Sequence, residues 1–377
     1  MRKTITIGDL GTIITGKTPP TTNKNYYGDY AVFIKPTDIS EQSKYTYETE
    51  EMYSKFAAEK YESSLIPKGA ICVPCIGTIG TKMTMAPCDC YTNQSINSIV
   101  CNENYDNEYV YYLIKNFLPG LKAYNLGTAS GREYVSKSNF EKIELVAEQD
   151  KTIQKRIGVI LSRYDSLIEN YQKQIKLLEE AAQRLYKEWF VDLHFPGHEN
   201  TKIVDGVPEG WEKKKVTDIL DVKYGKDHKQ LEAGNIPVYG TGGIMRYTDR
   251  SLYSGESVLI PRKGSLNNIM FVDETFWTID TMFYSIPKIE NAAKIVYFYL
   301  KGLDMYSLNI GAAVPSMTIS ILSGLDIQLP PNEIRLSFEG FMNKYFEEIK
   351  NYFSQIRLLT EARDRLLPKL MSGEIAV

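Results

Sequence analysis

A loop in the second half of the chain carries side chains that can read the edges of nucleic-acid bases. It runs Arg262-Lys263-Gly264-Ser265-Leu266-Asn267-Asn268 and follows the apolar stretch Ser257-Val258-Leu259-Ile260-Pro261. Arginine can donate two parallel hydrogen bonds to guanine, and asparagine can exchange two with adenine. A solvated polar turn has the same composition, so the loop alone leaves both interpretations open.

Two lysines stand at similar places, each directly after a glycine. They are Lys17, after Gly16, and Lys226, after Gly225. Such a lysine can bind a phosphate as a point charge, and it can equally be a solvated surface residue. Further polar candidates in loops or extended segments are Lys82, Arg132, Tyr134 and Arg246.

The five cysteines lie close together in the sequence, which argues against a disulfide framework spread along the chain. They are Cys72, Cys75, Cys88, Cys90 and Cys101. Thiolates at the spacing of the first four can bind zinc. The alternative is a set of small apolar residues in a core. Because spacing alone is a weak signal, we predict no metal site.

Glycine and proline patterns raise an enzyme as an alternative. A cofactor-binding glycine motif follows a strand and opens a helix, whereas Gly240-Thr241-Gly242-Gly243 precedes Ile244-Met245-Arg246-Tyr247, which reads as extended. Amino-methyltransferases carry Asp or Asn before Pro-Pro and an aromatic residue after it, and neither Pro19-Pro20 nor Pro330-Pro331 has them. The sequence also shows no acidic cluster typical of a nuclease. We therefore predict no catalytic residue and no cofactor.

Composition sets broad limits on the class of protein. Of the 377 residues, 43% are apolar and 24% are charged, as in ordinary globular proteins. No stretch approaches the roughly 20 apolar residues that span a bilayer, and the start lacks the pattern of a signal peptide, so we expect a cytoplasmic location. The formal charge of −3 is a mild argument against nucleic acid, but local basic loops remain compatible with it.

An internal repeat is the most informative feature of the chain. Four segments recur at offsets that fall from 209 to 181 residues. They are Gly16-Lys17 with Gly225-Lys226, residues 70–77 with 257–264, 127–145 with 311–329, and 169–178 with 350–359. Most of the drift falls between Lys17 and Pro74. A fixed scaffold with a variable insert suits a common frame holding two different reading domains, although a plain duplication gives the same pattern.

Two long amphipathic helices follow from a sustained 3-4 spacing of apolar residues. The first seam is Ile157, Ile160, Tyr164, Leu167, Tyr171, Ile175, Leu178, Ala182, Leu185 and Trp189. The second is Phe338, Phe341, Tyr345, Ile349, Tyr352, Ile356, Leu359, Arg363, Leu366 and Leu370, in which Arg363 interrupts the apolar pattern. We expect the two helices to pair antiparallel, each a rod of about 60 Å. The alternative is separate homodimerisation of each helix.

These pieces together resemble the specificity subunit of type I restriction-modification systems. The resemblance covers essentially the whole chain, in the right order. Its carriers are Leu185-Tyr186-Lys187-Glu188-Trp189-Phe190-Val191-Asp192, Phe195-Pro196-Gly197, Gly206-Val207-Pro208-Glu209-Gly210-Trp211-Glu212, Ile327-Gln328-Leu329-Pro330-Pro331 and Leu370-Met371-Ser372-Gly373-Glu374-Ile375. The first half departs from the pattern, since Glu144-Leu145-Val146-Ala147-Glu148 replaces the usual proline-rich lead into the helix.

The resemblance implies an α+β fold of two target-recognition domains, related by a pseudo-twofold axis and joined by two long α-helices in an antiparallel coiled coil. The implied domains are residues 1–148 and 211–331, with helices at 149–193 and 332–377 and a linker at 194–210. It further implies a non-catalytic subunit that reads a bipartite, asymmetric site on double-stranded DNA. Two methyltransferase subunits are expected to dock on it, and restriction-translocase subunits to join for cleavage. A catalytic methyltransferase or nuclease, and a coiled-coil scaffold without a DNA role, are the alternatives.

Under this resemblance, the repeat sorts the candidate residues by role. Residues that match between the halves, such as Lys17 and Lys226, are assigned to phosphate contacts. Unmatched polar residues of the loops are assigned to base readout, with residues 262–268 and 75–82 as the first choice. Arg132 and Tyr134 are a second choice.

Overall fold

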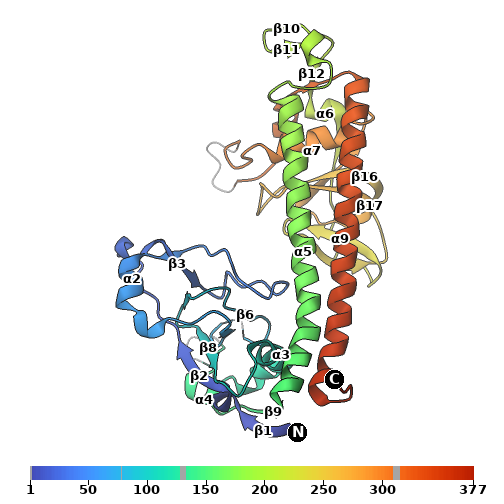
Figure 1. Cartoon of the computed structure of the whole chain (residues 1–377). Coiled ribbons are helices and arrows are strands. Elements are labelled where there is room, and N and C mark those ends of the chain that lie inside the picture. Colours follow the sequence, from blue (N-terminus) through green and yellow to red (C-terminus); the bar gives the residue numbers. More distant parts are fainter. Residues whose placement is uncertain (1, 78, 128–132, 309–314) are drawn as a thin grey trace. The chain divides into compact units, whose positions relative to one another are not determined.

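The computed structural model describes residues 2–77, 79–127, 133–308 and 315–377 (Figure 1). Contacts divide the chain into two units, which do not follow the order of the sequence. Unit 1 comprises Met1–Lys173 and Tyr352–Val377, and unit 2 comprises Gln174–Asn351. Each unit therefore holds one α+β domain together with parts of both long helices, α5 (Lys151–Phe190) and α9 (Asn332–Ser372). None of the described helices has the length and apolar character needed to cross a membrane.

The first domain is built from short strands and helices before α5. Their bounds are β1 (Arg2–Thr6), α1 (Ile7–Leu10), β2 (Gly11–Thr15), β3 (Tyr27–Ile34), β4 (Met52–Tyr53), α2 (Lys55–Lys60), β5 (Ile71–Pro74), β6 (Thr84–Met85), β7 (Tyr91–Thr92), β8 (Ile96–Cys101), α3 (Asn107–Phe117), α4 (Lys137–Glu141) and β9 (Glu144–Glu148). The strands form a sheet of order β2-β8-β5-β6, a sheet of order β4-β3-β7 and the antiparallel pair β1-β9.

Along the sequence, the second domain lies between α5 and α9. A hairpin of β10 (Ile203–Val204) and β11 (Val207–Pro208) precedes it. Its bounds are β12 (Glu212–Lys215), α6 (Val216–Ile219), β13 (Leu220–Tyr224), β14 (Ile236–Gly240), β15 (Gly243–Thr248), β16 (Tyr253–Pro261), β17 (Met270–Thr278), β18 (Met282–Pro287), α7 (Ala293–Lys301), α8 (Ile319–Gly324) and β19 (Asp326–Leu329). The main sheet has the order β13-β18-β16-β17-β14-β15, and β12 pairs with β19.

The repeat is visible in the topology of the two domains. The first strand pairs antiparallel with the last in both, as β1-β9 and β12-β19. A matching helix start follows: the carboxylate of Asp9 accepts a hydrogen bond from the Thr6 backbone at 2.7 Å, and Asp218 accepts one from Lys215 at 3.0 Å. The bond from Thr6 lowers the pKa of Asp9. Such a bond satisfies a main-chain donor at a helix N-terminus, so both domains begin with the same local device.

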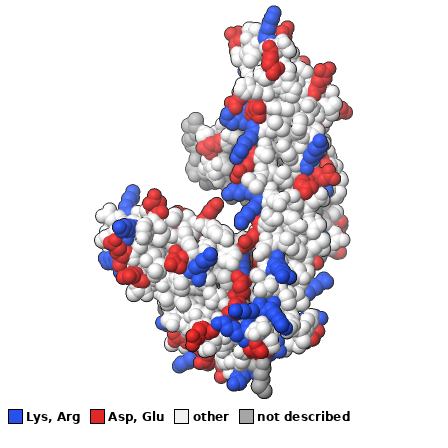
Figure 2. All heavy atoms as spheres, viewed as in Figure 1, with Lys and Arg blue, Asp and Glu red and all other residues white. Residues whose placement is uncertain are grey.

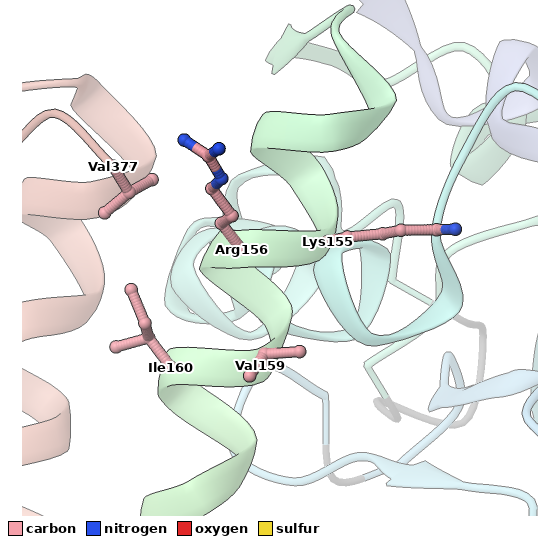
Figure 3. A pocket seen from close by; sticks show the side chains of 5 residues that line it. All are labelled: Lys155, Arg156, Val159, Ile160 and Val377. Carbon is pink, nitrogen blue, oxygen red and sulfur yellow. The ribbon is translucent and has the colours of Figure 1, made fainter.

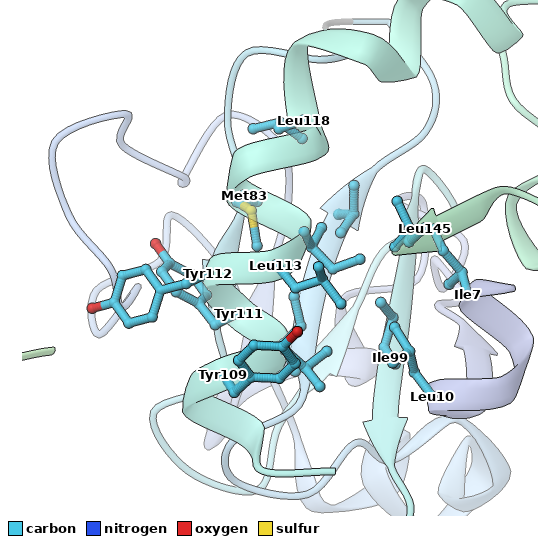
Figure 4. Packing of buried hydrophobic residues seen from close by; sticks show 14 of the residues in the cluster. Ile7, Leu10, Met83, Ile99, Tyr109, Tyr111, Tyr112, Leu113, Leu118 and Leu145 are labelled. Carbon is cyan, nitrogen blue, oxygen red and sulfur yellow. The ribbon is translucent and has the colours of Figure 1, made fainter. Parts of the chain in front are cut away.

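Each domain core also includes the two long helices. Around α3, buried apolar side chains of the first domain (Figure 4) pack with Ile157 and Leu161 of α5 and with Leu370 of α9. In unit 2 the core includes Trp189 of α5 and Phe338 of α9. Each large apolar side chain removed from water contributes about 1.5–3 kcal/mol, so each domain is firmly attached to the helices in its unit.

The helices pair antiparallel within the units. In unit 1, Asp165 of α5 bonds Arg363 of α9, and Tyr171, later in α5, stacks on Tyr352, earlier in α9. In unit 2, the ring of Trp189 lies 5.8 Å from that of Phe338. The predicted fold class, two α+β domains with two long paired helices, is confirmed.

The seam of the pair differs in detail from the predicted one. Leu161 and Ile168 are buried, whereas Leu167 is 45% exposed. In α9, Phe341 is 44% exposed and Met342 is buried. The physical reason is that each helix also packs on its own domain, which turns the buried face by one residue from a strict two-helix seam.

The residues predicted for the seam have a mixed outcome. Ile157 is buried in the core of unit 1, and the others are half-buried. They are Tyr164, Tyr171, Leu178, Leu185, Tyr345, Tyr352, Leu359 and Leu366. Arg363, which interrupts the apolar pattern, still lies inside the seam with 6% exposure, where it pairs with Asp165.

The two ends of the described chain meet in unit 1. The Arg2 guanidinium donates to the carbonyl oxygens of Leu370 and Met371, each at 3.0 Å. These carbonyls end α9 and have no partner within the helix. Gly373 leaves room for this arrangement, since a Cβ there would lie 1.9 Å from Nη1 of Arg2.

Candidate nucleic-acid interface

The main chain at Lys17 is held from two sides while its side chain is exposed. Its N–H donates to the Thr92 carbonyl at 2.9 Å, and Tyr53 Oη donates to its carbonyl at 2.5 Å. Gly16 permits this approach, because a Cβ there would lie 2.1 Å from the same Thr92 oxygen. Nζ lies 3.2 Å from Ser63 Oγ. The backbone is thus fixed and the ammonium group stays accessible.

In the second domain, two hydrogen bonds hold the main chain of Lys226 in a similar way. Its N–H donates to the Thr278 carbonyl at 2.9 Å, and Trp277 Nε1 donates to its carbonyl at 3.0 Å. A Cβ on Gly225 would lie 2.0 Å from the carbonyl oxygen of Ile279. Lys226 is exposed. The two predicted phosphate contacts therefore stand on equivalent, preformed backbone.

The loops that follow β5 and β16 share one anchored turn. Gly77 and Gly264 both have positive φ, 85° and 77°. Two residues later, Ile79 and Leu266 are buried, with exposures of 0% and 1%. Their N–H groups donate back to the glycine carbonyls at 3.1 and 2.9 Å. The turn is common to both domains, and the polar side chains around it are not.

The two asparagines of the second loop hold the loop itself. Asn267 Oδ1 accepts from the Met305 N–H at 2.8 Å, and its Nδ2 lies 3.3 Å from Asp304. Asn268 Nδ2 donates to the Thr241 carbonyl at 2.7 Å. With these amide groups engaged, Asn267 and Asn268 shape the loop rather than offer free hydrogen-bonding edges in this conformation.

Arg262 is fixed by aromatic rings. Its guanidinium carbon lies 4.6 Å from the centre of the Tyr224 ring and 5.1 Å from that of Phe283, and Nη1 donates to the Asp280 carbonyl at 2.6 Å. Its Nε is buried without a partner among the described residues. The neighbouring Lys263 is exposed, so it is the basic side chain of this loop with freedom to reach a ligand.

Arg246 on β15 has a structural partner. Its Nη2 donates to the Leu231 carbonyl at 2.6 Å. The same strand exposes Ile244, Met245 and Tyr247, with exposures of 49%, 57% and 52%. Sequence reasoning noted this strand and its arginine but missed these apolar side chains. An apolar residue on a strand edge gives no signal in sequence until the strand is known to be at the edge.

In the first domain the structure places Tyr134 beside the candidate loop. Tyr134 forms a β-bridge with Ile76, and its N–H donates to Asn125 Oδ1 at 2.8 Å. Lys82, at the end of the loop, is half-buried. Arg132 lies outside the described residues.

The first-choice and second-choice segments meet in both domains. The Val135 N–H donates to the Cys75 carbonyl at 2.8 Å, and the Met317 N–H donates to the Arg262 carbonyl at 2.9 Å. The segment after Arg132 and its counterpart near Ser316 therefore lie against the loops after β5 and β16. Each domain gathers its unmatched polar segments at one place.

The surface carries both signs of charge, interspersed on the face shown in Figure 2. Several lysines are neutralised by nearby carboxylates; Lys35 bonds Glu50, and Lys213 and Lys215 both bond Asp326. In the part of the chain that the structure describes, Lys226 and Lys263 form no ion pair. A chain with a net negative charge can therefore still present individual lysines that no carboxylate neutralises.

The cysteines and the glycine-rich segment have structural roles. Cys72, Cys75 and Cys90 are buried, and burial raises the pKa of the Cys72 thiol to about 12. Among the residues that the structure describes, no group of three or more His, Cys, Asp or Glu side chains is placed to hold a metal ion. Gly240 ends β14 and Gly243 begins β15 in an antiparallel hairpin, which does not open a helix.

Comparison with known families decides the identity of this fold. The family model described as the type I restriction modification DNA specificity domain matches residues 2–180 and again residues 208–363. The chain belongs to this family. The predicted resemblance is confirmed, and the double match agrees with the internal repeat. Proteins of this kind are the non-catalytic specificity subunits of type I restriction-modification systems.

Individual relatives agree with the family assignment. The MjaIX specificity subunit of Methanocaldococcus jannaschii is 28% identical over 412 residues, covering 98% of this chain and 93% of the relative. The HindI specificity subunit of Haemophilus influenzae is 34% identical over 177 residues, covering 46% of this chain and 38% of the relative. A crystal structure of the type I restriction-modification S subunit from M. genitalium aligns with a TM-score of 0.60 at 18% identity, over 98% of this chain and 96% of that one, and supports the fold.

Proposed function

We propose that this specificity subunit reads a bipartite, asymmetric DNA site, one half with each domain. The observation that carries the proposal is the equivalence of Lys17 and Lys226, whose main chains are held by the same contacts in two domains with different loops. Phosphate contacts set the position of a protein on DNA, and base contacts select the sequence. Both domains have the same kind of phosphate contact, but their loops differ. This combination favours two domains that bind DNA in the same way and read different half-sites.

The test is the methylation pattern of a host that carries this subunit with its methyltransferase. We expect modified bases in both halves of a motif with an unread spacer, and half-sites that differ in sequence. A continuous motif, or a perfect palindrome, would contradict the proposal. A host that carries the methyltransferase without the specificity subunit is the control.

We further propose that two methyltransferase copies dock on a surface that the repeat provides twice. On α5, Leu177 is 63% exposed beside the ion pair of Arg184 and Glu180 at 3.6 Å. On α9, the residues 181 positions after Leu177 and Glu180 are Leu358 and Glu361, whereas the counterpart of Arg184 is Arg365, so the glutamate pairs with a different arginine. There Leu358 is 48% exposed beside the ion pair of Arg357 and Glu361 at 3.2 Å. Two like surfaces suit two copies of one partner.

A second candidate surface, near the start of α5, lacks this duplication. It is an open hollow in which Ile160, Arg156 and Val377 point toward a common space, while Lys155 points away (Figure 3). The residues 181 positions after Lys155 and Arg156 are Leu336 and Ser337, which differ in chemistry. The hollow is therefore a poorer candidate for binding two identical subunits.

A further inference from the structure

The seams of the two long helices are nearly interchangeable. Tyr171 and Tyr352 are counterparts in the repeat, 181 residues apart, and they stack on each other with ring centres 5.1 Å apart. Ile175 and Ile356 are also counterparts. When counterparts face each other in an antiparallel pair, a second copy of either helix can take the place of its partner. On apolar packing alone, α5 could thus pair with α5 of another chain.

One layer of the seam breaks this equivalence. In unit 1, Asp165 Oδ1 accepts a hydrogen bond from Arg363 Nη1 at 2.5 Å, and the two residues are 4% and 6% exposed. Their counterparts 181 residues away are Phe346 and Ala182. The layer is therefore charged in unit 1 and apolar in unit 2.

The surroundings of each layer match its chemistry. In unit 1, Tyr112 Oη donates to Asp165, and Asp364 accepts from Arg363 Nε at 2.8 Å. In unit 2, the ring of Tyr297 on α7 lies 6.1 Å from the ring of Phe346. A tyrosine thus bonds the buried carboxylate in one unit, and a tyrosine packs near the aromatic ring in the other.

We propose that the Asp165–Arg363 layer commits α5 to α9 of the same chain and rejects a second copy of this chain as partner. If α5 paired with another α5, Asp165 would face Ala182 of the second copy. If α9 paired with another α9, Arg363 would face Phe346. Each arrangement buries a charge without its partner, which is strongly unfavourable, whereas the pairing within one chain satisfies both. A single polar seam position is known to select the partner of a coiled coil in this way.

The test replaces the charged layer by its apolar counterpart in the full chain. Asp165→Phe with Arg363→Ala gives unit 1 the layer of unit 2. Tyr171→Cys, in a Cys88→Ser background, reports the pairing, because the introduced thiol meets its copy on a second chain only when two α5 helices pair. Parent and variant are unfolded, refolded at high concentration and treated with a short bismaleimide linker. We expect about tenfold or more cross-linked dimer from the apolar-layer variant.

Three further variants sharpen this test. Asp165→Asn with Arg363→Gln, which removes both charges and keeps polar side chains, should also raise the dimer fraction. Asp165→Arg with Arg363→Asp keeps opposite charges within the layer and should stay as monomeric as the parent. Tyr352→Cys in place of Tyr171→Cys reports α9–α9 pairing. Circular dichroism identifies the variants that fold. If neither uncharged variant, once folded, cross-links more than the parent, the proposal is overturned.

Discussion

At the scale of single residues, the strongest functional signal is backbone geometry shared by the two repeats rather than side-chain type. Lys17 and Lys226 are common surface residues by composition. Their distinction is that each peptide group is fixed by a neighbouring carbonyl and by a donor from Tyr53 or Trp277. A fixed main chain has little freedom left to lose on binding, which favours a repeatable phosphate contact.

Replacing these lysines should weaken DNA binding without changing sequence preference. For Lys17→Ala or Lys226→Ala we expect lower affinity for all sequences and a salt-dependence slope that falls by about 1, because one phosphate contact is lost. The measurement is fluorescence anisotropy of the methyltransferase complex at several salt concentrations. Lys202→Ala, an exposed lysine outside both domains, is the control. A changed half-site preference would assign these lysines to base readout instead.

The residue scale also shows where sequence reasoning ends. The loop at residues 262–268 was predicted from its composition, and the structure does place it beside the second candidate segment. The use of Asn267 to bind the Met305 backbone could not be predicted, because that partner is 38 residues away. Side-chain type indicates what a residue can do, and only the fold decides which of its groups remain free.

At the scale of elements, the long helices were predictable and their exact faces were not. Apolar spacing locates α5 and α9 because it persists over many turns. It could not show that Leu167 faces outward, because the rotation of α5 depends on its packing against α3. Nor could it show that Arg363 binds Asp165, because the two residues are 198 positions apart in the sequence. Local periodicity thus predicts the element, and tertiary contacts set its rotation.

The duplicated helix surface leads to a stoichiometric prediction. Leu177→Asp and Leu358→Asp should each weaken docking of one methyltransferase copy, by about tenfold, and the double variant should weaken both. Native mass spectrometry of the complex would count the bound copies. Leu336→Asp, at a leucine that is 58% exposed and has no apolar counterpart on α5, is the matched control. Equal loss from the control would place the docking surface elsewhere.

At the scale of the whole molecule, both helices continue from one unit into the other, so their lengths should affect the two half-sites together. We predict that seven residues inserted after Lys173 and seven after Asn351 keep the heptad phase and lengthen the unread spacer. The insertions add about 10 Å of helix, or about three base pairs at about 3.4 Å each. The methylated motif should gain two or three spacer bases and keep both half-sites.

An insertion in one helix alone provides the control for this design. It leaves unequal helices whose seams cannot match, so we expect loss of methylation rather than a new spacer. If the doubly lengthened subunit were fully active with its original spacer, the helices would not set the distance.

The contact between Arg2 and the end of α9 has a consequence for the order in which the two units can be completed during synthesis. Unit 2 is one continuous segment, whereas unit 1 needs residues from both ends of the chain. The core of the first domain includes Leu367, Leu370 and Met371. A ribosome therefore delivers the first domain early but supplies these buried side chains only after all of unit 2 has been synthesised. The domain that is translated first is the one that is completed last.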